Sequence, residues 1–256
     1  MEYTKREIKD LAIVTFILAI VFGLNDGRDA FEIGYWLTNF LKILVICGIS
    51  IFLYDFAHDF AARKYGFFSE HRIWGIKRFS LSGKERFPRS IRLFGKEFKV
   101  RAFPLGIFIA IFLALFSNGH IYFAAVSSYR LMIRKSHRLG KKFVEVTDFE
   151  DAKIALAGPI MCIFIAIFFN IFNSAGTFDD VILINSLIAV YHMLPLPGLD
   201  GMKVYAGSKP LFVFAFLFII GAAILMSYLS TFAALLLTIL LAALFMMIYL
   251  YRSFYK

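Results

Sequence analysis

Cysteine is scarce in this sequence, and signs of cleavage or repetition are absent. The two cysteines, Cys47 and Cys162, lie inside apolar runs without the spacing of a zinc-binding motif, which favours small buried hydrophobic side chains over metal-ligating thiolates. No small-x-small cleavage site follows the apolar residues 11–24, so we predict a retained first span rather than a signal peptide. The lack of an internal repeat disfavours a small transporter, because many transporters consist of two related halves.

Acidic residues are also few. The chain has 18 Asp and Glu against 28 Lys and Arg, which gives a formal net charge of +10. Such an excess can indicate nucleic-acid binding, but here the positive charge is concentrated in a few loops between apolar runs. Cytoplasmic loops of membrane proteins carry an excess of Lys and Arg, which explains the pattern. We therefore predict no nucleic-acid partner.

Apolar residues dominate the chain: 60% of the residues are hydrophobic and 32 are Phe. The mean hydropathy is +0.74. Runs of about 20 apolar residues match the hydrocarbon thickness of a bilayer. The composition predicts an all-α, polytopic integral membrane protein in which residues 1–256 form a single membrane domain. The expected spans are residues 11–24, 33–62 and 151–173, with two closing transmembrane helices over 211–228 and 230–250.

Residues 104–126 are apolar but interrupted by Ser117–His120, and they lie between two basic segments, residues 63–101 and 127–149. A single crossing of the membrane would place one basic segment outside. A re-entrant hairpin that turns at Asn118–Gly119 leaves both on the cytoplasmic side, so the charge distribution favours the hairpin. This topology also places the N- and C-termini in the cytoplasm, with the cell membrane as the expected location.

The basic loop, residues 63–101, contains 12 Lys or Arg residues. Alternating polar and apolar residues over 89–94 and 98–101 predict two short cytoplasmic-side strands, with a hairpin turn at Gly95–Lys96. Two roles remain open for this loop. An unpaired strand edge could accept an extended peptide, or the loop could lie on the anionic surface of the lipid bilayer.

A group of ionisable residues stands at the end of the second predicted span, where charge is costly and therefore indicates function. Tyr54 and His58 are four residues apart, so they share one face of a helix. Zinc metalloproteases use this geometry in the motif H-E-x-x-H, which places two His ligands and a general-base Glu together. The motif here is Y-D-x-x-H, with Tyr54 at the first ligand position and Asp55 at the position of the Glu.

This segment resembles the site-2 protease family of intramembrane zinc metalloproteases. The likeness is strongest over residues 56–66, where a small residue, a basic residue and Gly66 follow the motif. It extends to Ala157–Gly158–Pro159 and to the stretch from Leu194–Pro195 to Asp200–Gly201, and so covers a core of about residues 40–205. The resemblance implies a site-2-protease-like core of transmembrane helices, a zinc cofactor, and hydrolysis of peptide bonds in the transmembrane segments of membrane proteins.

The resemblance also implies roles for individual residues. His58 and Asp200 match two of the family's zinc ligands, and Asp55 takes the place of the general base. His192 stands eight residues before Asp200, where the family usually has an Asn that stabilises the oxyanion. His192 is therefore expected either to serve as a substitute third ligand or to act on the oxyanion.

The departures from the motif support an alternative. A neutral phenol such as that of Tyr54 is a poor zinc ligand, because its reference pKa is about 10. Asp55 is one methylene shorter than Glu, and a misplacement of about 1 Å can reduce a rate by about 100-fold. The alternative is a catalytically inactive homologue that binds transmembrane segments without cleaving them. In it, His192 would hydrogen-bond Tyr54 or Asp55 within a metal-free polar network.

The remaining ionisable residues are assigned structural roles. Asp59 is predicted to pair with Arg63 one helical turn later. Lys203 is expected to extend its ammonium to the membrane interface. His71 and His137 are expected to be solvated in the basic segments, and His120 is placed at the re-entrant turn.

Overall fold

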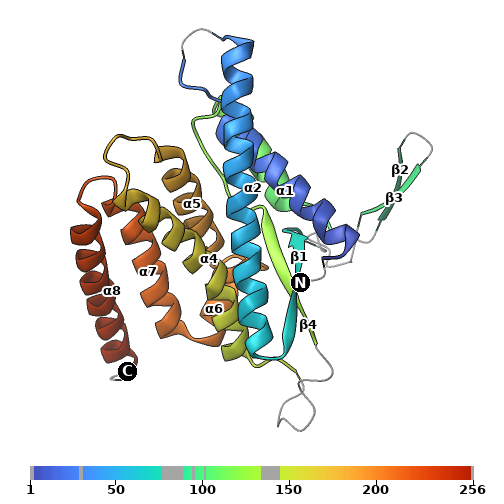
Figure 1. The fold of residues 1–256 in the computed structure, drawn as a ribbon. Helices are drawn as coiled ribbons and strands as arrows, with labels where there is room; N and C mark the ends of the chain where they lie inside the picture. Colours follow the sequence, from blue (N-terminus) through green and yellow to red (C-terminus); the bar gives the residue numbers. More distant parts are fainter. Residues whose placement is uncertain are drawn as a thin grey trace.

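The structure is a computed structural model that describes residues 3–28, 31–76, 89–93, 96–100, 102–133 and 145–254. Helices make up most of it (Figure 1). They are α1 (Lys5–Gly23), α2 (Ile33–Lys64), α3 (Leu105–Phe116), α4 (Asp148–Ile171), α5 (Asp179–His192), α6 (Asp200–Gly207), α7 (Lys209–Leu225) and α8 (Thr231–Phe254). The strands are β1 (Phe67–Ile73), β2 (Arg89–Leu93), β3 (Lys96–Val100) and β4 (Ser127–Ile133).

Three of the helices, α2, α4 and α8, are long and apolar enough to cross a bilayer, which indicates a membrane protein. They correspond to the second span, the span over 151–173 and the last closing span of the sequence analysis. The other predicted closing span forms α7, a shorter apolar helix of 17 residues. Helix α8 packs against α7 at one edge of the bundle (Figure 1).

Helix α2 is 32 residues long and packs against both α1 and α4 (Figure 1). Its buried residues recur at intervals of three and four along one stripe, which includes Ile43, Cys47, Ile51, Tyr54 and His58. The helix ends at Lys64. Gly66 follows with a φ of +81°, a conformation that favours glycine, and it directs the chain into β1.

Strands β1 and β4 form a two-stranded antiparallel sheet in which Phe67 lies opposite Ile133 and Ile73 opposite Ser127. The sheet packs against α1 and the second half of α2 through β1. The sequence analysis did not predict this sheet. The inward-facing positions of β1 after Phe67 are Ser69 and His71, so burial alternates along the strand while hydrophobicity does not.

Strands β2 and β3 form an antiparallel hairpin in which Arg89 lies opposite Val100 and Leu93 opposite Lys96. The two strands predicted in the basic loop are thus confirmed. Gly95, in the predicted turn, lies outside the described residues. The hairpin projects away from the helices (Figure 1).

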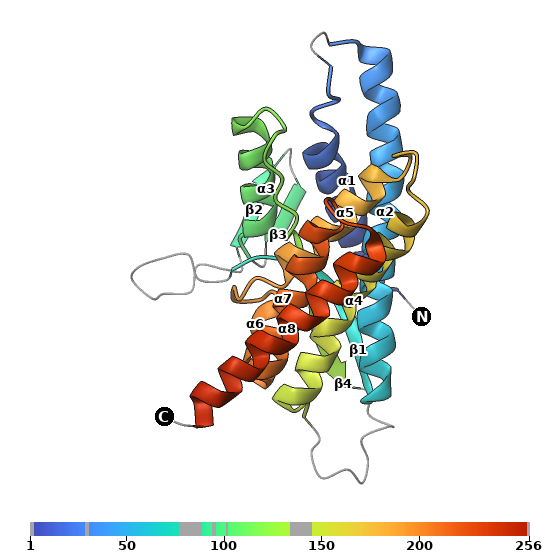
Figure 2. The same cartoon turned by 90° about the vertical axis from the view of Figure 1, so that its left-hand side faces the viewer.

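Helix α3 ends at a sharp reversal at Asn118 and Gly119, whose φ angles are +51° and +77°. Residues 120–126 then run back, so that Val126 returns to the start of α3. A Cβ on Gly106 would lie 2.5 Å from the Ala125 carbonyl oxygen. Helix α3 stands apart from α4, α5, α7 and α8 (Figure 2). The chain turns at the predicted position, and re-entry into a membrane stays a prediction.

Between α5 and α6 the chain is not helical. Gly198 has a φ of +90°, and α6 begins at Asp200. Gly201 is required for close packing, because a Cβ there would lie 2.0 Å from the Met193 carbonyl oxygen. The close packing of this segment between α5 and α6 places Asp200 in the interior, beside α2 and α4.

Candidate functional site

Tyr54 and His58 lie on the face of α2 that packs against α4. Both side chains are buried, with relative exposures of 1% and 0%, and their ring centroids are 4.7 Å apart. Gly158 of α4 makes room for them, because a Cβ at this position would lie 2.2 Å from His58 Nε2 and 2.6 Å from Tyr54 Cε2. The small residue in Ala157–Gly158–Pro159 therefore allows both rings to fit between the two helices.

Asp200 completes this group from α6. Its carboxylate is 1% exposed, and its Oδ2 accepts a hydrogen bond from the Tyr54 hydroxyl. The same oxygen lies 3.4 Å from His58 Nε2. The structure thus brings together the two predicted ligands, His58 and Asp200, and places the Tyr54 hydroxyl beside them.

Two atoms of this group lack a hydrogen-bond partner. His58 Nδ1 donates to the Ile154 carbonyl oxygen at 2.8 Å, which leaves a lone pair on Nε2 when the imidazole is neutral. Among the described residues, neither His58 Nε2 nor Asp200 Oδ1 has a hydrogen-bond partner. Buried polar atoms normally have hydrogen-bond partners, so these two atoms are the ones in the group that remain available to a ligand.

His192 also lies beside Tyr54, with 4.7 Å between the two ring centroids. Its Nδ1 donates to the Ile188 carbonyl oxygen at 2.8 Å, and its Nε2 accepts from the Ser127 hydroxyl at 2.9 Å. The ring is fully buried. His192 therefore reaches the group, but its Nε2 is bound to β4 rather than to Tyr54 or Asp55.

Asp55 points to a different place. Its Oδ1 lies 3.2 Å from His71 Nδ1 in β1, and both side chains are buried. The expectation that His71 is solvated is therefore wrong. It arose because His71 stands in a basic segment, while its burial depends on the packing of β1 against α2. His120 is exposed and lies 3.3 Å from Asn25 Nδ2, and His137 lies outside the described residues.

Of the structural roles assigned to Asp59 and Lys203, the first is found in the structure and the second is not. The predicted pair is confirmed, because Arg63 Nε donates to Asp59 Oδ2 at 2.7 Å. Lys203 turns inward instead of extending to the interface. Its Nζ donates to the Tyr129 carbonyl oxygen at 3.3 Å and lies 3.7 Å from Asp151. Burial lowers the pKa of Lys203, and the carboxylate of Asp151 offsets part of that shift.

The sequence analysis missed Ser127 and Tyr129 of β4 as neighbours of the site. Ser127 binds His192, and the Tyr129 ring lies 4.4 Å from the His58 ring, centroid to centroid. No motif marks either residue. The sequence offers no signal for them, because the burial of Ser127 and Tyr129 depends on how β4 packs.

The donor set does not fit a zinc ion as it stands. Within the described ranges, no three His, Cys, Asp or Glu side chains are arranged to hold a metal. Catalytic zinc normally has three protein ligands. His58 and Asp200 offer two, the Tyr54 phenol is a hydrogen-bond donor to Asp200, and His192 Nε2 is bound to Ser127.

Comparison with known proteins gives one distant relative. No protein-family model and no solved structure matches the chain. A protein of Methanocaldococcus jannaschii that carries the name "putative zinc metalloprotease" is 26% identical over 211 residues, which cover 79% of this chain and 84% of that relative. The chain is therefore similar, at a distance, to a protein named as a metalloprotease, consistent with membership of a protease family.

Proposed function

We propose that this chain is a site-2-protease-like membrane protein that binds transmembrane segments of other membrane proteins without cleaving them. The hydrogen bond from Tyr54 to Asp200 carries the proposal. It places a neutral phenol at the first ligand position and uses the carboxylate that would be the third ligand. In this proposal the chain keeps the core of helices that the family resemblance implies, with a polar network in place of a metal centre.

The position of Asp55 adds support. A general base must lie within hydrogen-bond reach of the proton that it removes. Asp55 instead pairs with His71 of β1, and no contact between Asp55 and His58 or Asp200 is found in the described part of the chain. The residue at the base position thus holds β1 against α2.

Strand β4 is the proposed contact for a bound segment. In its sheet it pairs on one side with β1, and it passes next to the buried polar residues through Ser127 and Tyr129. A strand with a free edge can take up an extended peptide through main-chain hydrogen bonds. Lys203 Nζ binds the Tyr129 carbonyl oxygen, so this contact must open when a peptide pairs with that part of β4.

A second candidate function is a zinc metalloprotease with a variant site. It is favoured by the unpartnered His58 Nε2 and Asp200 Oδ1, and by the name of the distant relative. Its ligands would be His58, Asp200 and His192, with Asp55 as base. It requires His192 to leave Ser127, and Asp55 to turn away from His71.

The proposed topology follows from the charge distribution. It places both termini and the basic segments in the cytoplasm and the turn at Asn118–Gly119 within the bilayer, with the cell membrane as the location. Irregular backbone at membrane depth needs protein or water around it, and residues 120–126 meet this need in part by packing against α3 and α5.

Metal content separates the two functions. The detergent-purified chain and a His58→Ala variant are analysed by elemental mass spectrometry. We expect no stoichiometric zinc in either protein. Zinc at about one per chain, lost in the variant, would instead establish the variant zinc site and make His192→Ala the next measurement.

Binding is tested with a transmembrane peptide that an active intramembrane metalloprotease cleaves. The purified chain alone should leave the peptide at full length. When it is added in excess, it should slow cleavage by the active enzyme, because it sequesters the peptide. A peptide that the chain itself shortens, or a cleavage rate that its addition leaves unchanged, would contradict the proposal.

A further inference from the structure

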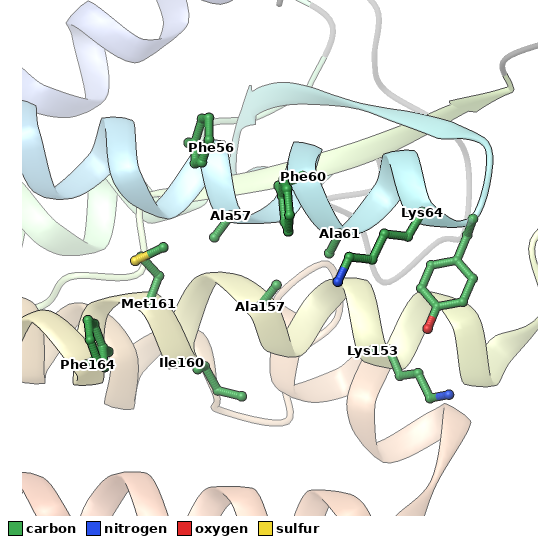
Figure 3. Close-up of a pocket in the computed structure, with 11 residues that line it drawn as sticks. Phe56, Ala57, Phe60, Ala61, Lys64, Lys153, Ala157, Ile160, Met161 and Phe164 are labelled. Carbon is green, nitrogen blue, oxygen red and sulfur yellow. The ribbon is translucent and has the colours of Figure 1, made fainter.

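A groove of about 450 Å³ lies between α2 and α4 on the outside of the helix pair (Figure 3). Its floor contains Ala57 and Ala157, the small residues next to His58 and Gly158. Its walls are large apolar side chains, several of which are more than a third exposed: Phe56, Phe60, Ile160 and Phe164. The groove is therefore an apolar channel that opens on the outer surface of two helices that are long enough to cross a membrane.

One end of the groove is cationic. Figure 3 shows Lys64 and Lys153 at this end, and Phe56, Met161 and Phe164 at the other. Lys64 Nζ lies 5.1 Å from the centroid of the Phe60 ring, and Lys153 Nζ lies 4.3 Å from that of Phe149. Neither ammonium takes part in an ion pair in the described ranges, although Arg63, next to Lys64, does. Two ammonium groups without an ion-pair partner in the described part of the chain thus stand where the apolar channel ends.

The length of the groove corresponds to one leaflet. On α2 its lining runs from Phe56 to Lys64, and on α4 from Lys153 to Phe164. At 1.5 Å per residue these stretches are about 12 Å and 17 Å long. The hydrocarbon core of a bilayer is about 30 Å thick, so the groove spans about half of it. Lys64 is the last residue of α2 and Lys153 lies in the second turn of α4, so both ammoniums stand near helix ends, which is where a spanning helix leaves the hydrocarbon.

We propose that this groove binds an anionic phospholipid, with an acyl chain between α2 and α4 and the phosphate between Lys64 and Lys153. The charge pattern favours a lipid over a transmembrane helix. A transmembrane helix crosses about 30 Å of hydrocarbon, about twice the length of the groove, and it brings no negative group to the two ammoniums. A phospholipid has one negative group at the end of an apolar chain of leaflet length. The proposal does not depend on whether the chain cleaves peptides.

The test is native mass spectrometry of the full chain, released from nanodiscs that contain equal amounts of phosphatidylglycerol and phosphatidylcholine. We expect phosphatidylglycerol to remain bound preferentially. In the double variant Lys64→Gln/Lys153→Gln, this adduct should fall about tenfold, because each basic residue near the headgroups adds to the attraction of anionic lipid. The control, Lys9→Gln/Lys209→Gln, removes the same charge from α1 and α7, away from the groove, and should retain the adduct.

A second variant tests the apolar part of the groove. Ala61→Phe places a ring in the channel and leaves both lysines intact, so it should displace the lipid while the thermal midpoint of the protein stays close to that of the parent. Equal retention of the two lipids by the parent chain would overturn the proposal. So would a phosphatidylglycerol adduct that survives in both the double lysine variant and a folded Ala61→Phe variant.

Discussion

The Tyr54 hydroxyl donates a hydrogen bond to the Asp200 carboxylate, although 146 residues separate the two positions in the sequence. The contact joins α2 to the start of α6 at a point where both side chains are almost completely buried. A buried carboxylate is costly unless it is hydrogen-bonded or paired. The phenol therefore supports Asp200 directly.

Removal of the Tyr54 hydroxyl should destabilise the protein. In Tyr54→Phe the Asp200 carboxylate loses its donor while it stays buried, and we expect the free energy of unfolding to fall by about 1–3 kcal/mol. Unfolding in mixed micelles with increasing denaturing detergent measures this change. The control is Tyr205→Phe on α6, the helix that carries Asp200. Tyr205 is 39% exposed, so this variant should show little change in stability. Equal losses for both variants would show that the hydrogen bond does not stabilise the site.

The metal site should be restorable. Tyr54→His combined with Asp55→Glu recreates H-E-x-x-H, and with His58 and Asp200 it supplies the three ligands of a catalytic zinc site. We expect about one zinc per chain in the double variant, by elemental mass spectrometry. The matched control adds His58→Ala and should lose the zinc. A double variant that still binds no zinc would mean that the cavity around positions 54 and 200 has also changed.

Gly158 should not tolerate a side chain. A Cβ at this position would lie 2.2 Å from His58 Nε2, so Gly158→Ala forces α4 away from α2 or displaces the ring. We expect a loss of about 1–3 kcal/mol in the free energy of unfolding, as for other overpacked cores. Gly34→Ala is the control, since no atom lies within 4 Å of a Cβ there, and it should leave stability unchanged or raise it slightly. If both variants unfold at the same denaturant concentration, α2 and α4 have room for a side chain at position 158, contrary to this prediction.

The buried pair of Asp55 and His71 should show strong coupling in a double-mutant cycle. Asp55→Ala and His71→Phe each leave the other side chain without its partner, at a cost of about 1–3 kcal/mol for each variant. The double variant should cost less than the sum, by about 0.5–3 kcal/mol. The exposed pair of Arg28 and Glu32, mutated to Ala in the same way, should show coupling near zero, because water screens it. If the losses in unfolding free energy at Asp55 and His71 simply add, the two side chains do not interact.

Properties that depend on residues near each other in the sequence could be predicted without the structure. Long apolar runs predicted α2, α4 and α8, because the bilayer sets a minimum length for a spanning helix. The spacing of Asp59 and Arg63 predicted their ion pair, because residues four apart are neighbours on a helix. Alternation over residues 89–94 and 98–101 predicted the strands of the β2–β3 hairpin. The basic segments on either side of residues 104–126 favoured a turn at Asn118–Gly119, where the chain reverses after α3.

Only the tertiary structure decided which polar groups meet. Sequence spacing placed Asp55 near His58, but the packing of β1 against α2 pairs Asp55 with His71 instead. His192 was expected at Tyr54 or at a metal, but the return of the chain into β4 provides Ser127 as its partner. These contacts join segments 16 and 65 residues apart, and no local periodicity encodes them. They are selected because a buried polar group must find a partner among whatever elements the packing of the helices brings to it.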